Sequence, residues 1–383
     1  MNGTALVGAT LVLPGRELDD HAVLVSGDRI VAVVPTAEVP PTYDVLDLGS
    51  GWLMPGFIDT QVNGGGDVLL NDRPDVDGIR TIAAAHRRFG TTGLLPTLIS
   101  DDPEVVDAAI AAVEAAMDRG VPGVLGIHVE GPHLNPGKRG IHDASKFTEI
   151  DGRVIARLTA PTRGVRLVTL APELAPAGAI RSLSEQGVVV AGGHSLADYD
   201  QVRAALDEGM SGFTHLFNAM TQLGSREPGM VGAALEDRSS RFGLIIDGLH
   251  VHPATLKVAL AARGVEGAML VTDAMPPVGG RTTSFKLMGR EIRVADGTCR
   301  GPDGTLAGSA LSMVEAVRNA IDMLGVSIIE ASVMASGTPA AFLGLAGEMG
   351  AIAPGLRADL VHLDANRRVA RTWIGGEISE DGE

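Results

Sequence analysis

The chain has 383 residues, of which 45% are hydrophobic and 20% charged, so it can bury a large core and is long enough for a barrel with a satellite domain. A net charge of −16 without a long run of Lys or Arg argues against nucleic acid or an anionic membrane as the main partner. The single cysteine, Cys299, excludes an internal disulfide and a cysteine-type zinc site. No apolar run reaches the roughly 18 residues of a membrane span, and the start of the chain lacks a basic signal-peptide region, so we expect a cytoplasmic protein.

The first segment of the chain, residues 1–52, consists of short β-rich runs separated by turn residues. It contains no long helical pattern. We predict that it forms the first part of a small β-domain.

The middle of the chain, residues 53–346, alternates apolar runs with helix-like stretches. The clearest helix spans Pro103 to Gly120, with apolar residues at helical spacing, a proline near its start and a glycine at its end. Eight strand candidates lie at 53–61, 91–99, 124–130, 165–171, 187–194, 212–217, 242–250 and 268–274. Eight units of roughly 30 residues predict an α/β fold, a (β/α)8 TIM barrel. The rival doubly wound sheet would need a nucleotide-binding turn after its first strand, and NGGGD at 63–67 lacks that spacing.

Two β-rich segments follow the eighth strand candidate. Residues 282–309 are rich in β formers and turns, and we interpret them as an insertion over the barrel mouth that covers substrate. Residues 347–383 repeat the pattern of the first segment. We predict that the two ends of the chain pair as one small β-sandwich domain.

Polar residues stand at or just past the ends of several predicted strands. The carboxyl ends of parallel strands in a barrel converge on one mouth, so Glu130, His194 and His215 can face a single ion. Imidazole and carboxylate groups suit zinc or a similar divalent ion, and catalytic sites use three protein ligands and leave a position for water. Taken singly, each residue could be a salt-bridged strand end or a hydrogen-bonded core histidine. Their joint occurrence at strands three, five and six favours a metal site.

Asp273, at the end of the eighth predicted strand, is the candidate proton acceptor. Water activated by a metal still needs a base that passes its proton to the leaving group. The alternative is an aspartate that caps the following segment. His128 shares a strand face with Glu130 and could support it or simply fill the barrel, and we expect surface or structural roles for His21, His86 and His362.

Sequence motifs are spread along nearly the whole chain. They are PGFIDTQVNGGG at 55–66, HVEGPHLN at 128–135, KRGIHD at 138–143, GGHS at 192–195, THLFNAM at 214–220, DGLHVHP at 247–253, LVTDAM at 270–275, GTLAGS at 304–309 and GAIAPGLRADLVHLD at 350–364. Together they resemble the N-acetylglucosamine-6-phosphate deacetylases of the amidohydrolase superfamily. PGFID alone is typical of amidohydrolases in general, whereas HVEGP, THLFNAM and DGLHVHP in combination are specific to the deacetylases.

The resemblance implies a role for each motif residue. Glu130, His194 and His215 would carry the metal, Asp273 would be the general acid and base, and His142 would polarise the acetyl carbonyl. The residues implied to bind substrate are Asn218, Ala219, Arg226, His250, Gln61 and Leu306.

Among these, Asn218 and Ala219 would hold the sugar phosphate, and His250 would add a contact to the phosphate or the sugar. Arg226 would reach the phosphate bound by the neighbouring subunit, which implies a homodimer. Without the resemblance, His142 is an exposed loop histidine, Asn218 and Ala219 are ordinary loop residues, and Arg226 is a solvated surface charge.

The chain departs from many amidohydrolases in one motif. Those proteins carry His-x-His after the first strand and bind a second metal there, whereas Gln61 and Asn63 stand at these positions here. An amide is a poor ligand for a transition metal. We therefore predict one divalent ion per subunit, zinc first, with iron, manganese and cobalt also compatible with the ligand set.

The implied reaction is removal of the acetyl group of N-acetyl-D-glucosamine 6-phosphate to give D-glucosamine 6-phosphate and acetate, in amino-sugar catabolism or cell-wall recycling. Asp273 would take a proton from water at the metal and deliver it to the departing nitrogen. Two alternatives remain. One is a dihydroorotase-like or aminoacylase-like amidohydrolase, which would not depend on phosphate. The other is a catalytically silent barrel, against which the intact ligands and base argue.

Overall fold

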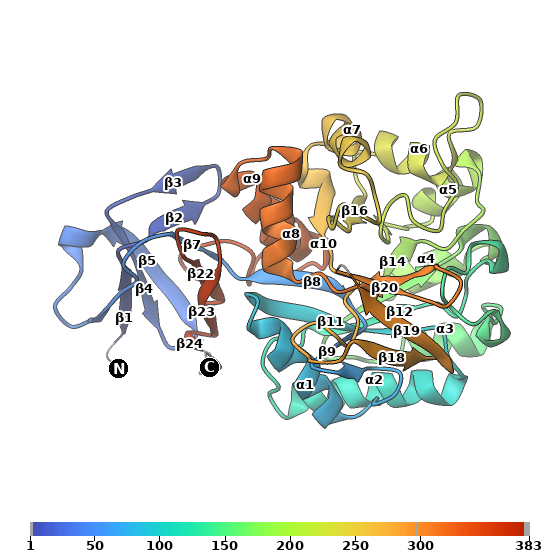
Figure 1. Cartoon of the computed structure of the whole chain (residues 1–383), viewed down its shortest axis with the longest axis horizontal. Coiled ribbons are helices and arrows are strands. Elements are labelled where there is room, and N and C mark those ends of the chain that lie inside the picture. Colours follow the sequence, from blue (N-terminus) through green and yellow to red (C-terminus); the bar gives the residue numbers. More distant parts are fainter. Residues whose placement is uncertain (1–2, 296, 379–383) are drawn as a thin grey trace.

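The protein is described by a computed structural model that covers residues 3–295 and 297–378. Its larger part is a (β/α)8 barrel, drawn on the right in Figure 1. Eight strands form one sheet in the order β17-β16-β15-β14-β13-β12-β11-β8, and every neighbouring pair is parallel. The strands are β8 (Phe57–Val62), β11 (Thr91–Ile99), β12 (Gly126–Glu130), β13 (Val165–Leu170), β14 (Val189–Gly192), β15 (Gly212–Phe213), β16 (Arg241–Leu244) and β17 (Ala268–Leu270). The predicted fold class is confirmed.

The first and last strands of this sheet, β8 and β17, meet at the seam of the barrel. Within residues 3–295 and 297–378, a single isolated bridge between Val62 and Ala274 joins them. The remaining contacts across the seam are made by side chains and by the backbone just past β17.

Most predicted strands have different bounds in the structure, and the seventh and eighth, which were predicted to reach residues 250 and 274, end at Leu244 and Leu270. The run 53–61 divides at Gly56, because a β-carbon there would lie 2.1 Å from Thr92 Oγ1 and the Gly56 amide donates to the Asp359 carbonyl. The part before Gly56 becomes β7 (Trp52–Pro55), which belongs to another sheet. The fifth and sixth strands are shorter than predicted, since His194 and His215 adopt positive φ angles that strand pairing does not accommodate.

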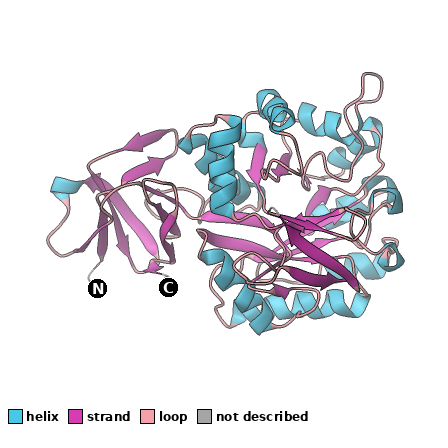
Figure 2. Cartoon of the chain, viewed as in Figure 1, coloured by secondary structure: helices cyan, strands magenta, loops and turns pink. Residues whose placement is uncertain are grey.

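Helices follow the barrel strands and cover the outside of the sheet (Figure 2). They are α1 (Val76–Arg87), α2 (Pro103–Asp118), α3 (Gly152–Leu158), α4 (Ala179–Glu185), α5 (Tyr199–Asp207), α6 (Gly229–Glu236), α7 (Pro253–Arg263), α8 (Met313–Asn319), α9 (Ile328–Ser332) and α10 (Thr338–Phe342). Short π-helical turns at Ala320–Leu324 and Val333–Gly337 continue α8 and α9, and 3-10 turns lie at Thr36–Glu38, Pro136–Lys138, Ala144–Lys146, Pro172–Leu174 and Val265–Gly267. The predicted helix at 103–120 is confirmed as α2.

The smaller part of the molecule is a β-sandwich made from both ends of the chain, drawn on the left in Figure 1. One sheet has the order β5-β4-β1-β6, and the other has the order β24-β23-β22-β7-β2-β3. The strands are β1 (Thr4–Val7), β2 (Thr10–Leu13), β3 (Arg16–Leu18), β4 (His21–Ser26), β5 (Arg29–Pro35), β6 (Asp44–Asp47), β22 (Leu360–Leu363), β23 (Val369–Ile374) and β24 (Glu377–Ile378). Buried residues of both ends, including Leu11, Leu53, Leu360 and Trp373, share one core.

The segment after β17 forms a four-stranded antiparallel sheet of β18 (Ser284–Leu287), β19 (Arg290–Ala295), β20 (Thr298–Arg300) and β21 (Leu306–Ser309). Cys299 is buried in it. A two-stranded hairpin, β9 (Gly64–Gly65) with β10 (Val68–Leu69), follows β8. In the two described ranges, 3–295 and 297–378, we find no helix with the length and apolar character that crossing a membrane requires.

Candidate active site

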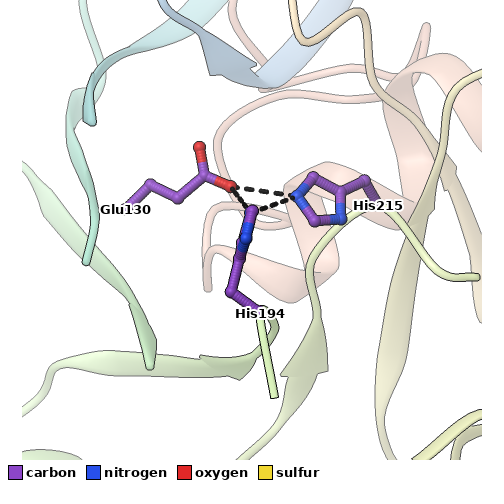
Figure 3. Close-up of side chains that lie close together, drawn as sticks. All are labelled: Glu130, His194 and His215. Carbon is purple, nitrogen blue, oxygen red and sulfur yellow. Dashed lines mark hydrogen bonds and ion pairs between the residues drawn. The ribbon is translucent and has the colours of Figure 1, made fainter. Parts of the chain in front are cut away.

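Three buried side chains from separate strands meet at the mouth of the barrel (Figure 3). Glu130 is the last residue of β12, and His194 and His215 lie two residues past β14 and β15. Glu130 Oε1 is 3.0 Å from His215 Nε2 and 3.3 Å from His194 Nε2, and the two Nε2 atoms are 3.0 Å apart. The structure thus brings together the three residues predicted to hold a metal.

The backbone carbonyl of Lys138 fixes the orientation of the His194 ring. This carbonyl lies 2.8 Å from His194 Nδ1, and a carbonyl only accepts hydrogen bonds, so Nδ1 must donate. In the neutral ring, Nε2 then has a free lone pair that points at Glu130 and His215. Second hydrogen bonds of this kind are usual for histidines that bind metals.

The charges of the cluster favour a cation between its members. Burial alone would raise the pKa of Glu130, but the close contacts with the imidazoles of His194 and His215 hold it well below its ordinary value. Burial lowers the pKa of His215, yet the hydrogen bond and charge of Glu130 raise it above its ordinary value overall. The carboxylate therefore retains its negative charge and attracts a positive one, whether a proton or a metal ion.

The donor set and its spacing fit a divalent metal. Three ligand atoms at about 2.1 Å from a tetrahedral ion would lie about 3.4 Å from one another. The observed separations of 3.0 to 3.3 Å are close to that value. Two imidazoles and one carboxylate are also a common ligand set for catalytic zinc and similar ions.

Asp273 lies at the same mouth of the barrel, three residues past β17, and its carboxylate accepts hydrogen bonds from two side-chain amides. Asn63 Nδ2 donates to Asp273 Oδ1 at 2.6 Å, and Gln61 Nε2 donates to the same oxygen at 3.2 Å. Gln61 Nε2 also lies 3.2 Å from both carboxylate oxygens of Glu130. Burial and the neighbouring charge of Glu130 raise the pKa of Asp273 to about 6. It is therefore a carboxylate at neutral pH that can bind a proton at small cost.

His142 comes from the loop after β12 and is buried, so the alternative interpretation as an exposed loop histidine is wrong. The Ser100 backbone amide donates to His142 Nδ1 at 3.3 Å, and Ser100 Oγ is 2.8 Å from the same atom. Burial, with the charges of the neighbouring histidines, lowers the pKa of His142 to about 3. The ring is therefore neutral with its proton on Nε2, which makes Nε2 a hydrogen-bond donor.

Backbone strain is concentrated in these residues. His194, His215, Ala219 and Asp273 have φ angles of 49°, 33°, 49° and 51°. Residues other than glycine adopt this left-handed region of φ uncommonly, and such strain is typical of functional sites. The strained turns aim the side chains into the barrel mouth instead of along the strands.

A cavity of about 450 Å³ opens over the cluster. Of the residues predicted to act in catalysis, metal binding or substrate binding, those that line it are Glu130, His142, His194, His215, Asn218, Ala219, His250, Asp273 and Leu306. Thr305, Leu306 and Gly308 bring the four-stranded insertion into its wall. Gln61 lies beneath the cavity, where it contacts Glu130 and Asp273. Arg226 is exposed on the loop before α6 and is not part of the cavity wall within the described chain.

His250 lines the cavity with its orientation set by Asp247. Asp247 Oδ2 is 2.5 Å from His250 Nδ1, and Asp247 Oδ1 accepts from the amides of Leu249 and His250. The pKa of Asp247 is lowered despite burial, mainly by the hydrogen bond from His250. Because His250 Nδ1–H donates its hydrogen bond to Asp247, Nε2 of His250 is the ring atom available to a ligand.

Sequence reasoning missed several partners of the predicted residues, namely Asp59, Asn63 as a partner of Asp273, Ser100, Lys138 and Asp247. Asp247 and Asn63 stand within the quoted motifs, so a search for polar neighbours could have found them. Lys138 also stands within a quoted motif, but its contact uses the backbone carbonyl, which the residue type does not indicate, and Ser100 lies outside the motifs, so only the fold shows that the two contact the histidines. Asp59 is fully buried, and its pKa is raised to about 7 by burial.

Comparisons with known proteins agree with this geometry. The amidohydrolase family matches residues 52–379. The N-acetylgalactosamine-6-phosphate deacetylase of Shewanella sp. (strain ANA-3) is 44% identical over 98% of this chain and 96% of that protein. The crystal structure of N-acetylglucosamine-6-phosphate deacetylase from Pasteurella multocida is 32% identical with a TM-score of 0.96, over 98% of this chain and 99% of that one. A mutant of the Mycobacterium smegmatis enzyme in complex with N-acetyl-D-glucosamine-6-phosphate is 34% identical with a TM-score of 0.90, over 99% of each chain.

Proposed function

The chain belongs to the amidohydrolase family, among its amino-sugar-phosphate deacetylases, and from that premise we propose that it hydrolyses the acetamide of an N-acetylhexosamine 6-phosphate. The products are acetate and the free amino-sugar phosphate. The resemblance found in the sequence motifs is confirmed by the family match together with the deacetylase relatives and solved structures. Neither the dihydroorotase-like nor the silent-barrel alternative gains support.

The observation that carries the proposal is the convergence of a metal-ligand cluster, a base and a hydrogen-bond donor on one cavity. Glu130, His194 and His215 form the cluster, Asp273 is the base and His142 is the donor. Amide hydrolysis needs these three functions, because the carbonyl must be polarised, water must lose a proton and the nitrogen must gain one.

Each residue has a defined task in this proposal. A divalent ion held by Glu130, His194 and His215 would polarise the carbonyl and make water acidic enough to attack near neutral pH. His142 Nε2–H donates to the carbonyl oxygen as negative charge develops there. Asp273 accepts the proton of the attacking water and returns it to the leaving nitrogen. Both amide contacts in the described chain use Oδ1 of Asp273, so Oδ2 is the atom that holds the proton.

The substrate is tested by measuring acetate release from N-acetylglucosamine 6-phosphate and N-acetylgalactosamine 6-phosphate, each beside its unphosphorylated sugar. Fast release that depends on phosphate supports the proposal. Release from other amides with no preference for phosphate would favour a different amidohydrolase. No release from any amide by metal-loaded protein would favour the silent barrel.

The galacto sugar is included because the Shewanella relative named for it is 44% identical to this chain, whereas the two solved glucosamine enzymes compared above are 32% and 34% identical. We propose that the chain accepts both epimers at C4. Equal or greater kcat/KM for the galacto substrate is the expected result. Turnover of the gluco substrate alone would restrict the function to N-acetylglucosamine 6-phosphate in amino-sugar catabolism or wall recycling.

We propose one zinc ion per subunit, because the nitrogen-rich set of Glu130, His194 and His215 suits zinc, and the Gln61 and Asn63 amides are weak ligands for a second ion. Elemental analysis of protein purified without added metal tests both the identity and the stoichiometry. Iron, manganese or cobalt in its place, or two ions per subunit, would overturn this part.

We further propose a cytoplasmic homodimer in which Asn218, Ala219, His250 and Leu306 bind the substrate within one subunit and Arg226 contacts the phosphate bound by the neighbour. The exposure of Arg226 outside its own cavity supports a role across an interface. Arg226→Gln should raise KM for the phosphorylated substrate only. When Arg226→Gln and Asp273→Asn proteins are mixed, a hybrid dimer contains one site with Asp273 from one subunit and Arg226 from the other, and this site should have a normal KM. A protein that is a monomer in solution would exclude the arrangement. Cell fractionation tests the location.

A further inference from the structure

Asp59 and Thr272 form a buried contact across the barrel seam that neither lines the cavity nor belongs to the predicted site. Asp59 is in β8, Thr272 lies two residues past β17, and both side chains are fully buried. Thr272 Oγ1 donates to Asp59 Oδ2 at 2.5 Å, and the Thr272 amide donates to Asp59 Oδ1 at 3.3 Å. Asp59 Oδ1 also accepts a hydrogen bond from the backbone amide of Gln61 at 3.2 Å.

This contact stands where the barrel sheet has no continuous strand pairing within the described residues. Strands β8 and β17 are the two ends of the eight-stranded sheet. They are joined by an isolated bridge between Val62 and Ala274, by backbone hydrogen bonds from Asn63 and Gly64 to Ala274 and from Asp273 to Gln61, and by the contact between Asp59 and Thr272. The Asp59 carboxylate therefore acts as a hydrogen-bond acceptor for the seam. A buried carboxylate is costly unless its hydrogen bonds are satisfied, and here every named partner is a donor.

Thr272 is followed directly in the chain by Asp273, the proposed base. Asp273 has a φ of 51°, in the left-handed region that residues other than glycine adopt uncommonly. Thr272 Oγ1 accepts from the Ala274 amide at 3.2 Å, so one hydroxyl connects Asp59 to the residue on the far side of Asp273.

The backbone of Asp273 is fixed on both sides of this turn. Its amide donates to the Gln61 carbonyl at 3.0 Å, and its carbonyl accepts from the Ser309 amide at 2.9 Å. Ser309 Oγ donates to the Thr272 carbonyl at 2.5 Å. A β-carbon on Gly308 would lie 2.7 Å from the Asp273 carbonyl oxygen, so the packing on that side is tight.

We propose that Asp59 and Thr272 are positioning residues for the deacetylation reaction, which hold the strained turn that aims Asp273 at the cavity. The inference rests on the proposed function for its kinetic part. Asp59 cannot serve as the base itself, because its oxygens face Thr272 and Gln61 and it is not part of the cavity wall.

The test replaces the hydroxyl of Thr272 and restores it. Thr272→Val keeps the shape but removes the hydroxyl hydrogen bond to Asp59 Oδ2, and kcat should fall by about tenfold to a hundredfold, since small displacements of a catalytic group have effects of this size. KM and bound metal should stay within about twofold of the unsubstituted protein, because the ligand cluster is untouched. Thr272→Ser should return kcat to within about threefold.

A matched control separates positioning from loss of stability. Thr372 is another buried threonine, in β23 of the β-sandwich, and its Oγ1 donates to the carbonyl of Arg87 in α1 at 3.1 Å. Thr372→Val should lower the melting temperature without changing kcat. If Thr272→Val and Thr372→Val both retain normal kcat, the positioning role is excluded.

A structural readout keeps the inference independent of the substrate. Crystal structures of Thr272→Val and Thr272→Ser should show Asp273 leaving the positive φ region in the first and keeping it in the second. An unmoved Asp273 in folded Thr272→Val would overturn the inference even if no substrate had been found. Should Thr272→Val fail to fold, Asp59→Asn changes the other partner of the same contact by replacing one carboxylate oxygen with an amide group, and an unmoved Asp273 with kcat within about twofold would be equally decisive.

Discussion

Asp273 combines a strained backbone, two amide contacts and a pKa raised to about 6. Replacing it with Asn keeps the size and most hydrogen bonds but removes proton transfer. We expect Asp273→Asn to lower kcat by about a hundredfold to ten-thousandfold, while metal content and substrate affinity persist. Kinetics together with calorimetric substrate titration measure both quantities. A near-normal rate in this variant would show that another group is the base.

The titration of Asp273 sets a pH dependence. The residue acts as a base only when ionised, so kcat/KM should decline as the pH falls through its pKa. A bound cation would lower the value of about 6, which places the midpoint of the acid limb at or below pH 6. A pH profile from about 4.5 to about 8 tests this. Activity that increases toward acid pH would contradict it.

At the scale of single elements, Arg166 shows how a barrel strand secures the helix before it. The side chain projects from β13, and Nη1 donates to the carbonyls of Arg157, Leu158 and Ala160 at 3.3, 2.7 and 2.9 Å. These carbonyls lie at the end of α3, where a helix lacks its own donors. The cation also suits the negative end of the helix dipole.

Arg166→Met should therefore lower the free energy of unfolding by about 2 kcal/mol, since buried carbonyls lose a charged donor. The kcat value should not change, because the residue lies outside the cavity wall. Arg153→Met, on the exposed side of the same helix, is the matched control and should change stability by less than about 0.5 kcal/mol. Urea unfolding measures both, and equal stability of the two variants would refute the capping role.

The elements were the most predictable level of this structure. Hydrophobic periodicity located all eight barrel strands and α2, because these segments bury a continuous apolar face. The ends of β14 and β15 were not predictable, since His194 and His215 look like strand residues until their backbone turns. The site followed the same division. Polar residues at strand ends indicated Glu130, whereas the Ser100 contact that fixes the His142 proton depends on two loops with no pattern in common.

At the scale of the whole molecule, buried histidines link stability to pH. His86 on α1 is fully buried with Nε2 2.9 Å from the Gly64 carbonyl, and burial lowers its pKa from 6.5 to about 4. The unfolded chain thus binds a proton that the folded chain does not bind between these values. Stability from this group is complete above about pH 6.5 and is lost as the pH falls toward 4.

We expect this single histidine to account for roughly 3 kcal/mol of acid destabilisation over that interval. The glutamine of His86→Gln does not titrate, so the free energy of unfolding of this variant should change less between about pH 7 and about pH 4.5 than that of the unsubstituted protein. Denaturant unfolding at both pH values measures the difference. Parallel pH dependence in the two proteins would mean that His86 is not the group responsible.

The β-sandwich places the first and last parts of the chain in one sheet, where β7 lies between β2 and β22. During synthesis, one edge of β7 therefore stays without its partner until Leu360 has left the ribosome, after the entire barrel sequence has been made. Apolar residues such as Leu53 and Leu11 remain without the part of their core that Ile352, Ala358, Leu360 and Trp373 supply for that time. The N-terminal strands are thus the first to be translated and among the last to gain all their partners. A nascent chain released early would expose an unpaired, aggregation-prone strand edge to chaperones and to other chains.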